Sequence, residues 1–225
     1  MPLFYSWSGS GIVKERGEAM DAKTIFSTVK NHKPSVLGHE QFRKFAVLLP
    51  LIEKNEELHV VFEVRSHQLR RQPGEICFPG GKIDAEDPSA KQAAIRETEE
   101  ELGVDPGRFT NVFPLDYLIS PFGMIVYSFV GYLDVSEEDL IRNPDEVREV
   151  FTVPLSFFLE NDPRIHYVHF EAQPEQNFPF DLIPGGEDYN WRTRQLEEYF
   201  YIYEDKVIWG MTARILSHFV DILKQ

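Results

Sequence analysis

The chain has 225 residues, 42% hydrophobic and 27% charged, which is enough apolar material for one large folded domain. Its formal net charge of −14 argues against a nucleic-acid partner and against an anionic membrane surface. The longest apolar run, residues 45–52, is far shorter than the roughly 18 residues of a membrane-spanning helix. A single cysteine, Cys77, excludes an internal disulfide, and no secretory signal is visible in residues 1–20. We therefore expect a cytoplasmic protein.

The N-terminal region predicts an arm, a helix and a hairpin. Residues 1–19 have neither helical nor strand periodicity, and we interpret them as a loosely attached, dispensable arm before a domain over residues 20–225. Asp21 is a good N-cap in front of apolar residues at helical spacing, so a short helix is expected there. Two strand-like runs, residues 44–52 and 58–65, flank a polar turn and predict a hairpin.

The clearest helix signal of the chain follows a short strand predicted at residues 76–78. Asp87 is expected as the N-cap, with Pro88 at the first helical position and Gly103 just beyond the end. After this helix, a very apolar run at residues 124–133 predicts a strand at the centre of a sheet rather than at its edge.

The C-terminal part of the chain is rich in aromatic residues. We expect the segment 167–203 to complete the sheet and the core. The sequence then closes with apolar residues spaced as on one face of a helix. These residues are Ile208, Met211, Thr212, Ile215, Phe219 and Ile222.

Three glutamates of the predicted helix fall on one face. Glu97, Glu100 and Glu101 are spaced i, i+3, i+4. Like charges on one face repel each other, so a positive group is expected to offset them. Oxygen-only ligands suit Mg²⁺ or Mn²⁺. A solvated acidic helix face is nevertheless the more common interpretation of a Glu-rich helix taken alone. The surrounding sequence decides between the two.

That surrounding sequence resembles the Nudix hydrolase family, whose box reads G-x5-E-x7-R-E-U-x-E-E-x-G-U with U apolar. Residues 96–104 match the second half at every position except Thr98, and the box as a whole spans about residues 81–104. The first half departs from the pattern, because Asp87 stands in place of the first glutamate and eight residues, rather than seven, separate it from the arginine.

A second motif precedes the box. Residues 65–81 read R-S-x3-R-x3-G-x3-F-P-G-G, which resembles the segment before the box in the coenzyme A diphosphatase branch of the family. That branch also tolerates the longer first half with its aspartate. Arg65 and Arg70 would offer bidentate guanidinium groups to the phosphates of a negatively charged substrate. With weaker matches further on, the resemblance covers most of residues 20–225.

The resemblance implies an α/β fold, a Nudix-type α/β/α sandwich with a mixed β-sheet. It assigns metal binding to Glu97, Glu100 and Glu101 and to the backbone carbonyl of Gly81. One of these glutamates, or Glu146 from a later loop, is expected to accept the proton of the attacking water. Residues that orient or shape the site complete the set: Arg96, Gly80, Gly103 and Asp87.

The implied reaction is hydrolysis of the diphosphate linkage of coenzyme A or a derivative, giving 3′,5′-ADP and 4′-phosphopantetheine, with Mg²⁺ or Mn²⁺ as cofactor. Two alternatives stay open. One is a broader nucleoside-diphosphate hydrolase acting on ADP-ribose or NADH, and the other is a non-catalytic module that binds a nucleotide. Loss of a box glutamate would indicate the module, and none is lost from the second half. No nucleic-acid or membrane partner is expected, and a homodimer is left open.

Overall fold

The computed structural model describes residues 21–225 and divides into two units, Met1–Glu40 and Gln41–Gln225. The predicted arm at residues 1–19 lies outside the described residues. In the first unit, helix α1 (Ala22–Lys30) begins after Asp21, whose side chain accepts a hydrogen bond from the Thr24 backbone N–H at 2.7 Å. The predicted N-cap is confirmed.

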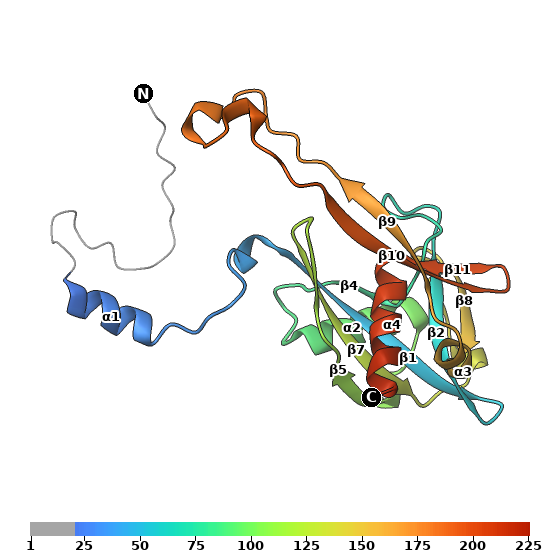
Figure 1. The fold of residues 1–225 in the computed structure, drawn as a ribbon. Coiled ribbons are helices and arrows are strands. Elements are labelled where there is room, and N and C mark those ends of the chain that lie inside the picture. The colour runs from blue at the N-terminus through green and yellow to red at the C-terminus, as the bar shows by residue number, and fades with distance from the viewer. Residues whose placement is uncertain (1–20) are drawn as a thin grey trace. The chain divides into compact units, whose positions relative to one another are not determined.

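The second unit is built on an eight-stranded mixed sheet (Figure 1). Its central strands run in the order β3-β2-β1-β7-β5, with β4 paired to β1, β6 to β7 and β8 to β2. Strand β1 is antiparallel to β2 and parallel to β7, which confirms the mixed sheet. Strand β7 is the apolar run predicted at residues 124–133, and it lies between β1 and β5, away from the edge of the sheet, as expected. The strands are β1 (Arg43–Lys54), β2 (Glu57–Arg65), β3 (Ile76–Cys77), β4 (Gly80–Lys82), β5 (Phe109–Pro114), β6 (Leu118–Ser120), β7 (Met124–Leu133) and β8 (Val147–Pro154).

Helices cover both faces of this sheet. Successive side chains of a strand point to opposite faces, so Leu48 and Leu49 on β1 enter two different cores. Helix α2 (Ala90–Leu102) packs into the core that contains Leu48. Helices α3 (Leu155–Glu160) and α4 (Gly210–Leu223) pack into the core that contains Leu49. The predicted α/β/α layering is therefore present.

The aromatic segment does not complete this sheet, and that prediction was wrong. Strands β9 (Arg164–Phe170), β10 (Arg194–Tyr203) and β11 (Lys206–Trp209) form a separate three-stranded antiparallel sheet. Nearly all of β9 is exposed, and Tyr167 keeps 55% of its surface accessible. In this sheet, only Tyr201 near the end of β10 and Ile208 on β11 are buried, and both belong to the core that contains Leu49.

The final helix begins later than its apolar spacing suggested. Gly210, with a φ of +63°, turns the chain from β11 into α4, so Ile208 belongs to the strand and not to the helix. Ile222, in the last turn of the helix, is 40% exposed. Within residues 21–225, no helix combines the length and the apolar character needed to cross a membrane. Short 3₁₀ turns occur at His39–Gln41, Pro106–Arg108, Glu137–Asp139, Phe180–Leu182 and Gly186–Asp188.

Candidate active site

Helix α2 carries the glutamates of the box, and its N-cap is Ser89. The Ser89 side chain accepts a hydrogen bond from the Gln92 backbone N–H at 3.2 Å. The prediction of Asp87 as N-cap was wrong, because the Asp87 carboxylate accepts from Arg96 Nε at 3.0 Å instead. At the other end, Gly103 closes the helix in the left-handed conformation, with a φ of +67°, as expected of a terminal glycine.

The three glutamates on the shared face lie at different depths. Glu101 is 3% exposed, and its Oε2 accepts a hydrogen bond from the Gly80 backbone N–H at 2.8 Å. The side chain of Glu97 is 15% exposed, whereas that of Glu100 is 55% exposed. Glu101 therefore faces the strands, and Glu100 faces solvent.

Arg96 links most of the box carboxylates. Its guanidinium lies 3.0 Å from Asp87, 2.9 Å from Glu97 and 3.2 Å from Glu100. The hydrogen bond from Arg96 lowers the pKa of Asp87, and the surrounding acids, Asp87 first, raise the pKa of Arg96. The arginine is thus a fixed cation beside the acidic face, and Asp87 serves to hold it. These positions are compatible with the expected orienting roles, which stay predictions.

Strand β4 approaches both β1 and α2 so closely that two glycines are required. A Cβ on Gly80, whose φ is +151°, would lie 2.4 Å from the Ala46 carbonyl oxygen. A Cβ on Gly81 would lie 2.4 Å from the carboxylate carbon of Glu97. The Gly81 backbone is therefore packed directly against a predicted metal ligand, where its carbonyl was expected to contribute.

A further carboxylate, which the sequence analysis did not single out, lies beside this helix. Glu63 on β2 is 1% exposed, and its Oε1 accepts a hydrogen bond from Cys77 Sγ at 3.2 Å. A single acid within the buried run at residues 60–64 was the available sequence signal. Cys77 lies on β3, is half-buried and forms no disulfide.

The buried carboxylates repel one another. Burial, together with the charges of Glu63, Glu97 and Glu146, raises the pKa of Glu101 to about 9. Burial likewise raises the pKa of Glu63 to about 7 and raises the pKa of Glu97. Glu146 is half-buried, and its charge contributes to the raised pKa values of Glu63, Glu97 and Glu101. A hydrogen bond of 2.7 Å from the Ser66 N–H to the Glu146 carbonyl holds its loop at the end of β2.

The donor chemistry of this group suits a hard dication such as Mg²⁺ or Mn²⁺. Within residues 21–225, no three His, Cys, Asp or Glu side chains are arranged as a ready metal site, and Glu97 and Glu100 are both engaged with Arg96. Two features nevertheless fit a cation: burial and the neighbouring acids raise the pKa values of Glu97 and Glu101, and Glu63 Oε2 is buried without a hydrogen-bond partner among the described residues.

A cavity of about 760 Å³ lies next to these carboxylates. Its lining includes Arg65, Cys77, Gly80 and Gly81. The last three also contact the acids, because Cys77 donates to Glu63, Gly80 donates to Glu101 and Gly81 packs on Glu97. The segment from Cys77 to Gly81 is therefore shared by the cavity and the acidic group.

The arginines of the second motif are placed differently from one another. Arg65 lines the cavity, and its Nε is buried with no hydrogen-bond partner among the described residues. Arg70 is exposed and does not line the cavity, whereas its neighbour Arg71 does. The loop between β2 and β3 thus turns the second of two adjacent arginines toward the cavity, which the motif spacing alone did not predict.

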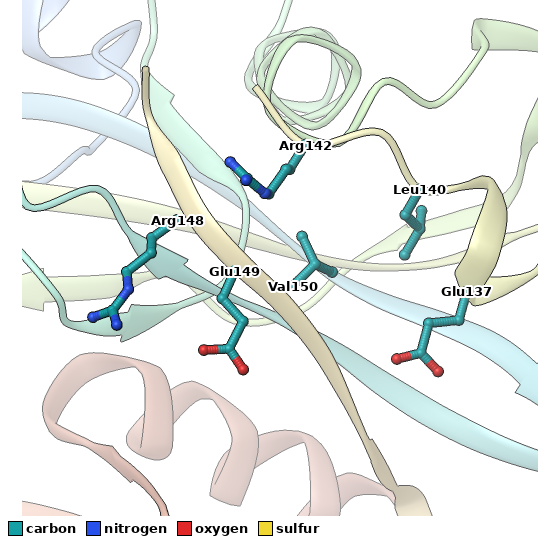
Figure 2. Close-up of a pocket in the computed structure, with 6 residues that line it drawn as sticks. All are labelled: Glu137, Leu140, Arg142, Arg148, Glu149 and Val150. Carbon is teal, nitrogen blue, oxygen red and sulfur yellow. The ribbon is translucent and has the colours of Figure 1, made fainter. Parts of the chain in front are cut away.

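A second, smaller hollow of about 320 Å³ lies along β8 and the turn before it (Figure 2). Figure 2 shows the carboxylates of Glu137 and Glu149 and the guanidinium groups of Arg142 and Arg148 around Val150. Several of these charges already have partners in the chain: Lys54 pairs with Glu137, and Lys206 with Glu149. No predicted site residue lines this hollow.

The chain is similar to known proteins over most of the main sheet. A family model described as NUDIX domain matches residues 42–176. The chain is 39% identical over 141 residues to the peroxisomal coenzyme A diphosphatase NUDT7 of Mus musculus, covering 63% of this chain and 58% of that protein. It is 36% identical over 139 residues to the peroxisomal coenzyme A diphosphatase ndx-8 of Caenorhabditis elegans, covering 58% and 56%. It is 34% identical over 174 residues to the uncharacterized Nudix hydrolase NudL of Photorhabdus laumondii, covering 77% and 81%. The chain thus spans little more than half the length of the mouse and nematode relatives.

Proposed function

The chain belongs to the Nudix family, and from that premise we propose that it hydrolyses the diphosphate linkage of coenzyme A or a derivative, with Mg²⁺ or Mn²⁺ as cofactor, to give 3′,5′-ADP and 4′-phosphopantetheine. The observation that carries the proposal is the position of residues 65–81, which border both the arginine-lined cavity and the buried carboxylates. The mouse and nematode relatives, both named coenzyme A diphosphatases, support the same substrate.

The acidic group would hold the dication. Glu97 and Glu101 are its principal ligands, and Glu100 and the Gly81 carbonyl complete the set. When bound, Mg²⁺ or Mn²⁺ offsets the charge of the diphosphate and lowers the pKa of water. Arg96 keeps the glutamates aligned through its ion pairs with Glu97 and Glu100.

The substrate and the proton are assigned to other side chains. Arg65 offers a buried Nε with no partner in the described chain, so a substrate phosphate can take it without displacing an existing hydrogen bond. Arg70 and Arg71 lie on the same loop, and Arg71 lines the cavity. Among the candidate bases, Glu146 is favoured because it is half-buried and open to water, whereas Glu101 is almost fully covered.

Two further points complete the proposal. We place the protein in the cytoplasm, which its single cysteine supports, although the mouse and nematode relatives are named peroxisomal. Imaging of the full chain with a fluorescent tag tests this, and a peroxisomal signal would contradict it. Measuring the molar mass of the protein in solution tests whether it forms a homodimer.

A product assay tests the function. Coenzyme A, ADP-ribose, NADH and a diadenosine polyphosphate are each incubated with the protein, with Mg²⁺, with Mn²⁺ and with EDTA. We expect coenzyme A to have the highest kcat/KM, and turnover to require a dication. If ADP-ribose were turned over tenfold better than coenzyme A, a difference of about 1.4 kcal/mol in transition-state binding, the substrate assignment would be wrong and the family would stand.

The non-catalytic module is the alternative outcome of the same assay. In that case none of the four substrates would be cleaved with either dication, while a nucleotide would still bind. Isothermal titration with ADP-ribose and coenzyme A separates this outcome from a simple failure of the protein to fold.

A further inference from the structure

Glu63 occupies an unusual place for an acid. It lies on β2 between Phe62 and Val64, both of which are buried, and only 1% of its own surface is accessible. Its Oε1 receives a hydrogen bond from Cys77 Sγ at 3.2 Å, but Oε2 is buried and has no partner among residues 21–225. A buried carboxylate oxygen without a donor is costly to the fold. Some compensating interaction is therefore expected in the working protein.

The strand pattern places Glu63 on the side of the acidic helix face. Side chains alternate along β2, so Glu63 shares a face with Val61, which packs in the core of α2. Across the sheet, Glu63 lies opposite Cys77 on β3 and opposite Val150 on β8, and Val150 also packs against the core of α2.

Burial raises the pKa of Glu63 more than the charge of Arg65, two positions further along β2, lowers it, and no ion pair joins the two side chains within residues 21–225. Arg96 pairs with Asp87, Glu97 and Glu100, but the ion pairs found among the described residues reach neither Glu63 nor Glu101. A free oxygen of a buried acid, next to a second buried acid, is the arrangement that a bound cation satisfies.

We propose that Glu63 is an additional carboxylate of the dication site, contributed by strand β2 rather than by the box helix. Its unpartnered Oε2 and its charge add to those of Glu97 and Glu101 and strengthen the binding of Mg²⁺ or Mn²⁺. Cys77 acts as a positioning residue, because its thiol holds Oε1 and leaves Oε2 free. The inference rests on the dication site of the proposed function.

Direct titration of Mn²⁺ into the substrate-free protein tests this without reference to activity. Wild type is compared with Glu63→Gln, which keeps the size, and Glu63→Leu, which removes all polarity. Glu53→Gln is the control, since Glu53 is an exposed acid on the neighbouring strand. Glu101→Gln reports on the dication site itself. Melting in EDTA at pH 8 checks folding, and both Glu63 variants should melt no lower than wild type.

We expect both Glu63 variants to weaken Mn²⁺ binding at least tenfold, and the Glu53 variant to stay within twofold of wild type. If Glu101→Gln weakened binding while both Glu63 variants bound like wild type, the inference would fail and the dication site would stand. If wild type bound no Mn²⁺, or Glu101→Gln bound normally, both would fail. A metal effect of Glu63 without cleavage of coenzyme A would overturn only the proposed substrate.

Discussion

Replacing Glu101 by glutamine removes the most deeply buried charge of the box helix and keeps its size. In the metal-free protein the pKa of this carboxyl is about 9, against 4.5 for an ordinary glutamate. Because the folded-state pKa is raised, the unfolded chain loses this proton first as the pH rises above 4.5. The carboxyl therefore costs the fold progressively more between about pH 4.5 and 9, when no metal is bound.

The size of the effect follows from the interval between the two pKa values. One group contributes about 1.4 kcal/mol per pH unit, so at pH 8 the wild-type carboxyl costs up to about 5 kcal/mol. The glutamine keeps an oxygen for the Gly80 N–H but buries a new amide NH₂, at a cost of about 1–3 kcal/mol. We expect Glu101→Gln to be about 2 kcal/mol more stable than wild type at pH 8, which is about 4–8 °C in Tm.

Thermal unfolding in EDTA at pH 5 and pH 8 measures this difference. At pH 5 the wild-type cost nearly vanishes, so the glutamine variant should melt at or below wild type, and the order should reverse at pH 8. Glu99→Gln, on the same helix but off the acidic face, is the control and should change the Tm little at either pH. A glutamine variant less stable than wild type at pH 8, or a difference independent of pH, would refute the reasoning.

The remaining predictions concern the glycines and the arginines. Gly81→Ala should lower kcat/KM for coenzyme A at least tenfold with little loss of Tm, because the new Cβ meets only the end of the flexible Glu97 side chain. Gly80→Ala should melt several degrees lower than wild type, because its new Cβ meets the backbone of Ala46 and Val47. Equal Tm losses would contradict this. Arg65→Ala should lower kcat/KM by roughly 10–150-fold, the loss of a contact of about 1.5–3 kcal/mol, and lysine should restore only part of it. Arg71→Ala should lower kcat/KM more than Arg70→Ala, and the reverse order would mean that the motif arginine, not its neighbour, meets the substrate.

The box helix could be predicted from sequence because its signals are local. The glutamate spacing and the closing glycine act within a few turns: the three glutamates lie on α2 and Gly103 ends it, as expected. The N-cap was misplaced by two residues. The Asp87 carboxylate accepts a hydrogen bond from Arg96, nine positions later in the chain, and Ser89 caps the helix instead.

The features that were missed depend on strand pairing and loop path. Glu63 joins the acidic group because β2 lies beside β3 and faces α2, which no spacing within β2 reveals. The loop path similarly decides that Arg71, rather than Arg70, reaches the cavity. The exposed second sheet was mistaken for core because aromatic content indicates strands but does not say whether a layer covers them.

Mass-spectrometric product analysis of coenzyme A hydrolysis tests the central claim most directly. Wild type, Glu101→Gln and Glu99→Gln are each incubated with coenzyme A and Mg²⁺, and wild type also with EDTA. We predict that wild type and Glu99→Gln release 3′,5′-ADP and 4′-phosphopantetheine in equal amounts. EDTA should abolish the reaction, and Glu101→Gln should slow it at least a few hundredfold, which is on the order of 3 kcal/mol. Equal product release with EDTA, or normal turnover by Glu101→Gln, would contradict the account.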